Sequence, residues 1–210
     1  MRGAWLIVGF GGAVAAAEPA PLPEASGLEG RPVMTSLPAA NTRQPPSPRA
    51  LVDARAELQR RYREVLFRAT TSAGADRAAE IFVEDGAAEP DRALKWLLLD
   101  EARRFGAASG NAVAISRAVT LASATYDFDS LDMEYRALVE IPLRGVSAER
   151  ALAVAGAAEG VATKAEIDRR FELALSAQDL AIKAWQRAGA REACRRAMIR
   201  HSEMAAAAGQ

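Results

Sequence analysis

Proline is distributed unevenly along this chain of 210 residues, and its distribution limits where helices can form. Eight of the 10 prolines lie between residues 18 and 48, whereas only Pro90 and Pro142 follow. Proline lacks an amide donor and clashes with the preceding helical turn, so it disfavours the interior of a helix. The first stretch also has few large apolar residues to offset the entropy of ordering it. We therefore expect residues 18–48 to form a disordered, proline-rich linker and residues 49–208 to form a folded helical domain.

The composition after residue 48 favours helices throughout. Alanine, arginine, leucine and glutamate predominate there, and all four are strong helix formers. Apolar residues recur at spacings of three and four, and no run of alternating β-branched residues suggests a strand. The sequence thus predicts an all-α fold of antiparallel helix pairs, stacked as a short repeat array or packed as a compact bundle. The expected helices cover residues 48–70, 75–88, 90–110, 112–126, 130–142, 147–158, 163–189 and 191–207.

Several of these helices carry boundary signals of their own. Ser47 and Ser147 are residue types that cap the first turn of a helix. Pro90 fits the first turn of the third helix, where its missing amide costs nothing. Thr163 and Glu166 have the spacing of a capping box, in which two side chains each satisfy a free backbone amide. This capping box predicts that a new helix starts at residue 163.

Part of the sequence recurs at a shift of 79 residues, from Gly110 to Gly189. Small residues occupy matching positions around both glycines: Ala102, Ala114 and Ala118 match Ala181, Ala193 and Ala197. Small residues let two antiparallel helices approach closely, and glycine allows the turn between them. The shift is about twice the ~40 residues of one helix pair, which is typical of helical repeat proteins.

Residues 90–207 resemble the tetratricopeptide-like helical repeat proteins of exported bacterial type. The segments that carry the resemblance are LLLDEARRFGAASGNAVAISRAV, ERALAVAGAAEGVATKAEID and DLAIKAWQRAGAREACRRAMIRH. The resemblance implies antiparallel helix pairs that stack into a short curved array and bind other proteins. It assigns no binding residue to any position of this chain.

The N-terminal residues have the pattern of a cleaved secretory signal. Arg2 supplies a positive charge, and the stretch 4–17 carries no charge and ends in three alanines. This stretch is shorter than the roughly 20 residues that a membrane-spanning helix needs, and its small residues are typical of a cleavage site. We expect residues 1–17 to be a signal peptide cleaved after Ala17, with an uncut anchor as the alternative. The mature chain would then reach the periplasm or the extracellular space without a stable membrane span.

The charge and the counts of cysteine and histidine argue against several classes of site. The 27 basic residues balance the 27 acidic ones, so nucleic acid is not an expected partner. A single cysteine cannot form a disulfide framework within the chain, and a single histidine cannot supply a site that needs two imidazoles. Cys194 and His201 lie about 10.5 Å apart along one helix, too far for a nucleophile–base dyad. We expect no catalytic residue, no cofactor and no metal site. Among the acidic residues between 127 and 134, we expect Asp129 or Ser130 to cap the following helix, while the other acids favour its positive end.

The last predicted helix carries the candidate partner-contact residues Arg191, Arg195, Arg196 and Arg200. A solvated face with no binding role is the alternative for these arginines. We interpret the chain as a non-catalytic, exported interaction or scaffold module for a protein or peptide partner, with its oligomeric state left open. A helical bundle that binds or senses a small ligand in the cell envelope is the alternative function. That alternative predicts a closed apolar cavity of several hundred Å³, and an enzyme predicts convergent buried carboxylates.

Overall fold

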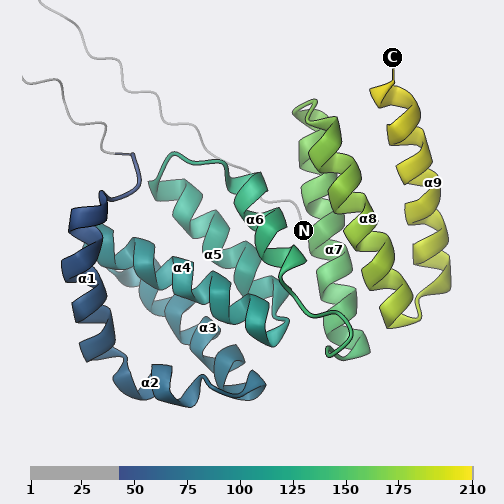
Figure 1. The fold of residues 1–210 in the computed structure, drawn as a ribbon. Coiled ribbons are helices and arrows are strands. Elements are labelled where there is room, and N and C mark those ends of the chain that lie inside the picture. Colours follow the sequence, from purple (N-terminus) through teal and green to yellow (C-terminus); the bar gives the residue numbers. More distant parts are fainter. Residues whose placement is uncertain (1–42, 210) are drawn as a thin grey trace, which may run out of the picture. The chain divides into compact units, whose positions relative to one another are not determined.

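The computed structural model describes residues 43–209, and within this range all regular structure is helical (Figure 1). The predicted signal peptide and the predicted linker up to residue 42 lie outside the described residues. The all-α prediction is confirmed for the described range. Its helices are α1 Pro48–Arg61, α2 Arg63–Arg68, α3 Ser72–Ala88, α4 Arg92–Ser109, α5 Ala112–Thr125, α6 Ser130–Val139, α7 Ala148–Ile167, α8 Phe171–Ala188 and α9 Arg191–Ala208.

The first predicted helix, 48–70, is wrong as a single element, because Tyr62 separates α1 from α2. Tyr62 has a non-helical φ of −111° and ψ of 20°. It is buried, and its ring packs edge-on against Phe82 of α3 with 5.1 Å between ring centroids. Aromatic pairs of this geometry contribute more than their buried area alone. The interruption coincides with a tertiary contact that the local sequence does not encode.

The predicted starts of the third and seventh helices are also wrong. Pro90 precedes α4, because Asp91 caps this helix and accepts the amide of Leu94 at 2.8 Å. Thr163 lies inside α7, where its hydroxyl donates to the carbonyl of Glu159 at 2.8 Å. A threonine within a helix commonly donates such a hydrogen bond to a backbone carbonyl of the preceding turn. The helices predicted at 147–158 and 163–189 are therefore one long α7 followed by α8.

The two turns matched by the 79-residue shift have the same geometry. Gly110 and Gly189 both adopt left-handed conformations, with φ of 79° and 73°. Each glycine and the residue after it donate to carbonyls of the preceding helix, closing α4 and α8 in the same way. This pair of bonds is a common helix ending that requires a positive φ. The prediction that glycine forms both turns is confirmed.

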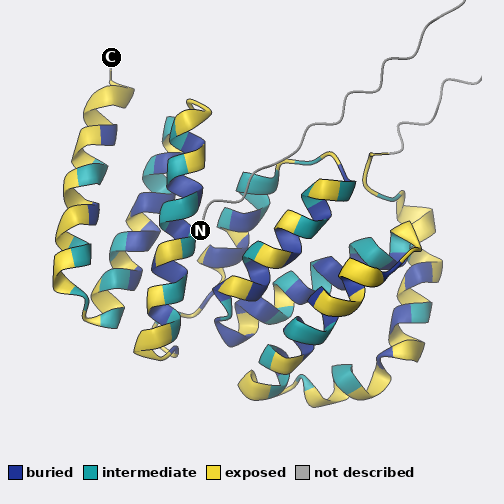
Figure 2. Ribbon diagram, turned by 180° about the vertical axis from the view of Figure 1, so that it is seen from behind, coloured by how far each residue is buried: buried dark blue, intermediate teal, exposed yellow. Residues whose placement is uncertain are grey.

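The helices bury two large apolar clusters. One lies among α1, α3, α4 and α5 and includes the fully buried Phe82 and Leu98. The other lies mainly among α5, α6, α7 and α8 around Ile115, Leu138 and Val154. Figure 2 shows buried residues as stripes along the helices, as expected for amphipathic elements. The helices α7 and α8 pack against each other, and both carry fully buried alanines that belong to this cluster: Ala151, Ala155, Ala158, Ala162, Ala177, Ala181 and Ala184.

The last residues of the predicted linker contact the helical body. The carbonyl of Arg43 accepts the amide of Asp127 at 2.6 Å, and the Arg43 side chain pairs with the Asp127 carboxylate at 2.9 Å. Arg92 donates to the carbonyl of Gln44 at 3.3 Å. The chain thus enters α1 along the α5–α6 loop. Within residues 43–209, no helix combines the length and the apolar character needed to cross a membrane.

Candidate protein-binding surface

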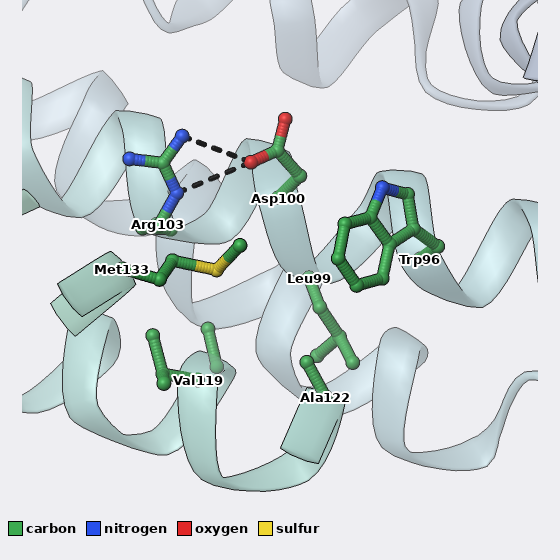
Figure 3. Close-up of a pocket in the computed structure, with 8 residues that line it drawn as sticks. Trp96, Leu99, Asp100, Arg103, Val119, Ala122 and Met133 are labelled. Carbon is green, nitrogen blue, oxygen red and sulfur yellow. Dashed lines mark hydrogen bonds and ion pairs between the residues drawn. The ribbon is translucent and has the colours of Figure 1, made fainter. Parts of the chain in front are cut away.

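A small, partly open cavity lies between α4, α5 and α6 (Figure 3). Trp96, Leu99 and Met133 are among its lining residues, and the ion pair of Asp100 with Arg103, at 2.9 Å, lies at its side. The cavity volume is about 10 Å³, roughly the smallest space that holds one water molecule. This cavity does not provide the several hundred Å³ that a small-ligand site requires.

The acidic residues between α5 and α6 have separate partners, and Asp129 is the cap, as one of the two predicted residues. Asp129 caps α6 by accepting the amide of Asp132 at 3.0 Å. It also accepts two hydrogen bonds from Arg170, at 2.8 and 2.7 Å, which lower the pKa of its carboxyl group. The side-chain partners of the other acids are Arg43 for Asp127, Arg136 for Asp132 and Ser116 for Glu134. These carboxylates therefore serve helix ends and packing contacts rather than converging on one point.

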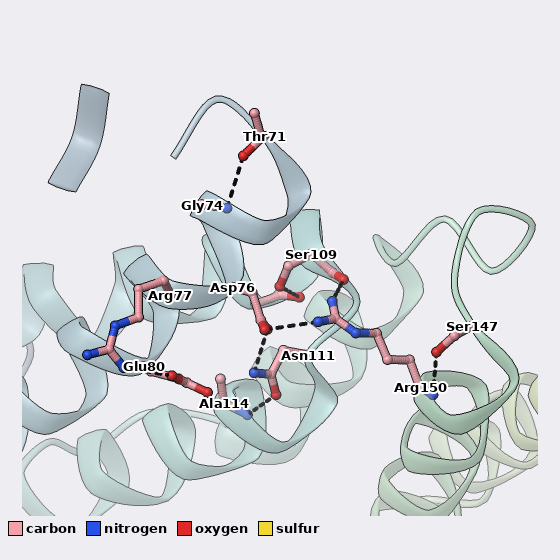
Figure 4. Close-up of polar contacts among 11 residues, drawn as sticks. Thr71, Gly74, Asp76, Arg77, Glu80, Ser109, Asn111, Ala114, Ser147 and Arg150 are labelled. Carbon is pink, nitrogen blue, oxygen red and sulfur yellow. Dashed lines mark hydrogen bonds and ion pairs between the residues drawn. The ribbon is translucent and has the colours of Figure 1, made fainter. Parts of the chain in front are cut away.

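A polar network that the sequence analysis missed connects α3, the α4–α5 turn and α7 (Figure 4). The Asp76 carboxylate accepts one bond from Asn111 and one from Arg150, both at 2.9 Å. Arg150 also donates to the carbonyl of Ser109, and Asn111 caps α5. The donors and acceptors satisfy one another at a junction between the two apolar clusters. We interpret this network as structural, because each group already has a partner within it.

The helix α9 lies at one edge of the described helices and packs on α8 (Figure 1). Its buried residues are Ala197 and Met204, and Gln178 of α8 donates to the carbonyl of Ala197 at 3.1 Å. The opposite side of α9 is exposed along its length (Figure 2). This arrangement leaves one side of an amphipathic helix without a covering element in the described part of the chain.

The four predicted partner-contact arginines do not form one patch. Arg200 turns toward α7, where it pairs with Glu166 at 3.1 Å and donates to Thr163 at 2.9 Å. Arg191 and Arg195 line a groove on one side of α9, whereas Arg196 and Arg200 line a groove on its other side. The four candidate residues are therefore divided between two grooves, and their role in partner contact stays a prediction.

We call the first of these surfaces the arginine groove. It lies between α8 and α9, has a volume of about 480 Å³, and is lined by Trp185, Gln186, Gly189, Arg191, Cys194, Arg195 and Met198. Trp185 is held in place because its indole donates to Glu159 of α7 at 2.9 Å. Within residues 43–209, neither Arg191 nor Arg195 has an ion-pair partner, and the side chain of Met198 is 53% exposed. The arginine groove thus places two free guanidinium groups beside apolar surface.

We call the second surface the outer groove. It has a volume of about 440 Å³ and is lined by Glu166, Arg196, Ile199, Arg200, Glu203 and Met204. Ile199 is 53% exposed there. The outer groove presents an apolar side chain between groups of both charges.

Several residues of both grooves were not predicted from the sequence. Trp185 is half-buried: it packs against the apolar cluster of α5 to α8 and also lines the arginine groove. Met198 and Ile199 could have been found by placing α9 on a helical wheel, because they lie away from the stripe of Ala193 and Ala197. Cys194 and His201 form no dyad, since Cys194 lines the arginine groove while His201 lies 3.2 Å from Asp179 of α8.

Comparison of the chain with protein-family models, with curated proteins and with solved structures gives no match.

Proposed function

We propose that this chain is a non-catalytic interaction module of the tetratricopeptide-like helical repeat type, which binds a protein or peptide outside the cytoplasm. The uncharged N-terminal stretch that ends at Ala17 supports export. N-terminal sequencing of the exported chain tests cleavage at this residue. The two helix pairs closed by Gly110 and Gly189 support the repeat character of the module.

The arginine groove is the observation on which the proposed binding function rests. Several exposed arginines of the described residues, Arg49 and Arg55 among them, have no ion-pair partner. Arg191 and Arg195 differ from these two in that they line a groove beside apolar side chains, and they too have no acidic partner among residues 43–209. A guanidinium group binds a carboxylate through two parallel hydrogen bonds. The groove therefore suits a partner segment that supplies carboxylates of its own.

The apolar part of the arginine groove restricts which peptides can bind there. Trp185 offers a large ring that is fixed by Glu159, and Met198 offers a flexible, exposed thioether. Tryptophan and arginine dominate the binding energy of many protein interfaces, and methionine adapts to differently shaped partners. We propose an extended or helical peptide that carries a large apolar residue flanked by aspartate or glutamate.

Selection from a random peptide library on the immobilised mature chain tests this function. We expect the enriched peptides to combine acidic residues with a large apolar residue. Their binding should be lost in the double variant R191E/R195E, because two attractive charges become repulsive. A matched control is R49E/R55E on α1, which makes the same change of charge at two exposed arginines that are distant in sequence from the arginine groove.

The selection contradicts the proposal under two outcomes. The first is that no peptide family is enriched over unloaded support. The second is that enriched peptides bind R191E/R195E as tightly as they bind the unmodified chain. Loss of binding in R49E/R55E as well would mean that net charge, and not the arginine groove, governs binding.

A further inference from the structure

The outward side of α9 carries charges of both signs around one exposed apolar residue. Ile199 lies near the centre of this side, opposite the buried Ala197 and Met204. Arg196 precedes Ile199 by about one turn, and Glu203 follows it by about one turn. Both charged residues are exposed, and neither has an ion-pair partner within residues 43–209.

Helix geometry places Arg196 and Glu203 on the same flank of this outward side. Seven residues correspond to about two turns, so the two side chains project in nearly the same direction. They lie about 10.5 Å apart along the axis, which is too far for them to pair within one helix. A complementary surface must therefore present a carboxylate and a cation at the same separation, in the reverse order.

A second copy of α9 in antiparallel orientation presents that surface. A two-fold axis next to Ile199 brings Arg196 opposite Glu203 of the partner subunit, and Glu203 opposite Arg196 of the partner subunit. The same axis brings the two Ile199 side chains together at the centre. Self-complementarity of this kind is what a two-fold symmetric dimer requires, because both subunits use the same patch. We infer that two copies of this chain associate through antiparallel α9 helices.

The small residues of α9 support a close helix–helix contact. Ser202 and Ala206 follow Ile199 along the outward side, and both are exposed. Small residues at these positions let two helix backbones approach without displacing side chains. Antiparallel helices that pair in this way place complementary charges along the flanks of an apolar seam.

The expected dimer is weak. A single helix side with one large apolar residue buries less area than the roughly 1,200–2,000 Å² of a stable interface. Exposed ion pairs each contribute little to affinity and are screened by salt. The dimer should therefore form at high protein concentration and dissociate as salt is added.

This inference goes beyond the proposed function, because it uses the other flank of α9. Trp185, Arg191 and Cys194 line the arginine groove and lie away from the Arg196–Glu203 flank. Arg195, which also lines that groove, lies about one turn before Ile199 on the outward side, so the dimer contact reaches the edge of the groove.

Sedimentation velocity of the mature chain over a concentration series at low salt tests the inference. We expect a reversible monomer–dimer equilibrium. The single charge reversals Arg196→Glu and Glu203→Arg should each raise the dimer dissociation constant about tenfold or more, because each creates two like-charge contacts. The double variant R196E/E203R restores opposite charges at both contacts and should recover the dimer.

The control for this experiment is Arg191→Glu, which changes a charge on α9 outside the proposed contact. It should leave the dimer dissociation constant unchanged and weaken only the binding of selected peptides. The inference is overturned if the chain is a monomer at every concentration, if the single reversals have no effect, or if the double variant does not recover the dimer. Failure of the peptide selection with an intact charge-dependent dimer would reject the proposed function alone.

Discussion

At the scale of single residues, short polar side chains determine where several helices begin. Ser47, Thr71, Asp91, Asn111, Asp129 and Ser147 each accept a backbone amide from the first turn of the helix that they precede. Such caps satisfy amides that have no partner inside the helix. Asp129 has a second role, because its carboxylate also pairs with Arg170 near the start of α8. Substitutions of Asp129 can therefore separate the contribution of the helix cap to stability from that of the ion pair.

We expect Asp129→Asn to remove the pH-dependent contribution of residue 129 while keeping the cap. Arg170 lowers the pKa of Asp129 in the folded state, so the ionised form stabilises the fold. This stabilisation is present above the unfolded-state pKa, about 3.9, and is lost as the pH falls through the lower folded-state value. The difference in unfolding free energy between the unmodified chain and D129N should therefore shrink between pH 6 and about pH 2. Urea denaturation at both pH values measures it.

Asp129→Ala provides the comparison, because alanine removes both the cap and the ion pair. At pH 6 it should cost about 1 kcal/mol more than D129N, the usual contribution of a helix cap. An equal cost of D129A and D129N, or a D129N effect that persists unchanged at acid pH, would contradict the two separate roles.

At the scale of helices, the turns after α4 and α8 have the same backbone but different surroundings. Gly110 and Gly189 share a positive φ and the same hydrogen-bonding pattern. A Cβ atom at residue 110 would lie 2.6 Å from Cγ1 of Val146, whereas residue 189 has open space around it. The pair therefore separates the cost of the backbone conformation from the cost of crowding.

We expect Gly189→Ala to destabilise the chain by about 1–2 kcal/mol, the cost of a left-handed conformation for a residue with a Cβ atom. Gly110→Ala should cost more, because Val146 must also move. Gly160→Ala inside α7 is the control, and should be neutral or stabilising by up to about 1 kcal/mol, because this helical position has free space. Denaturant unfolding of the three variants measures the series. Equal losses of unfolding free energy in Gly110→Ala and Gly189→Ala would contradict the expected clash with Val146.

Helix type and most helix ends were predictable from the sequence, because their causes are local. Glycine at the turns, the spacing of apolar residues and the cap residues Ser47, Asp129 and Ser147 are all visible without a structure. The break at Tyr62 was not predictable, since its ring contacts Phe82 on another helix. The continuity of α7 through Thr163 was also missed, because a helix start and a tolerated mid-helix threonine have the same local pattern.

At the scale of the whole described body, the contacts that position the grooves join distant parts of the chain. Arg150 reaches Asp76, 74 residues away in sequence, and Arg200 of α9 reaches Glu166 of α7, 34 residues away. Sequence spacing within one helix gives no information on such pairs. The sequence therefore identified the basic last helix, but it could not show that Arg200 is paired or that Arg195 and Arg196 face different grooves.

The central claim is that α9 carries the binding surface of the molecule, with the partner peptide in the arginine groove. Amide and indole NMR spectra of the ¹⁵N-labelled chain, recorded while a library-selected peptide is added, test it most directly. We expect the largest shifts at the indole of Trp185 and at the amides of Arg191, Cys194, Arg195 and Met198. Shifts centred on α1–α3, with the signals of these five residues unchanged, would contradict the claim.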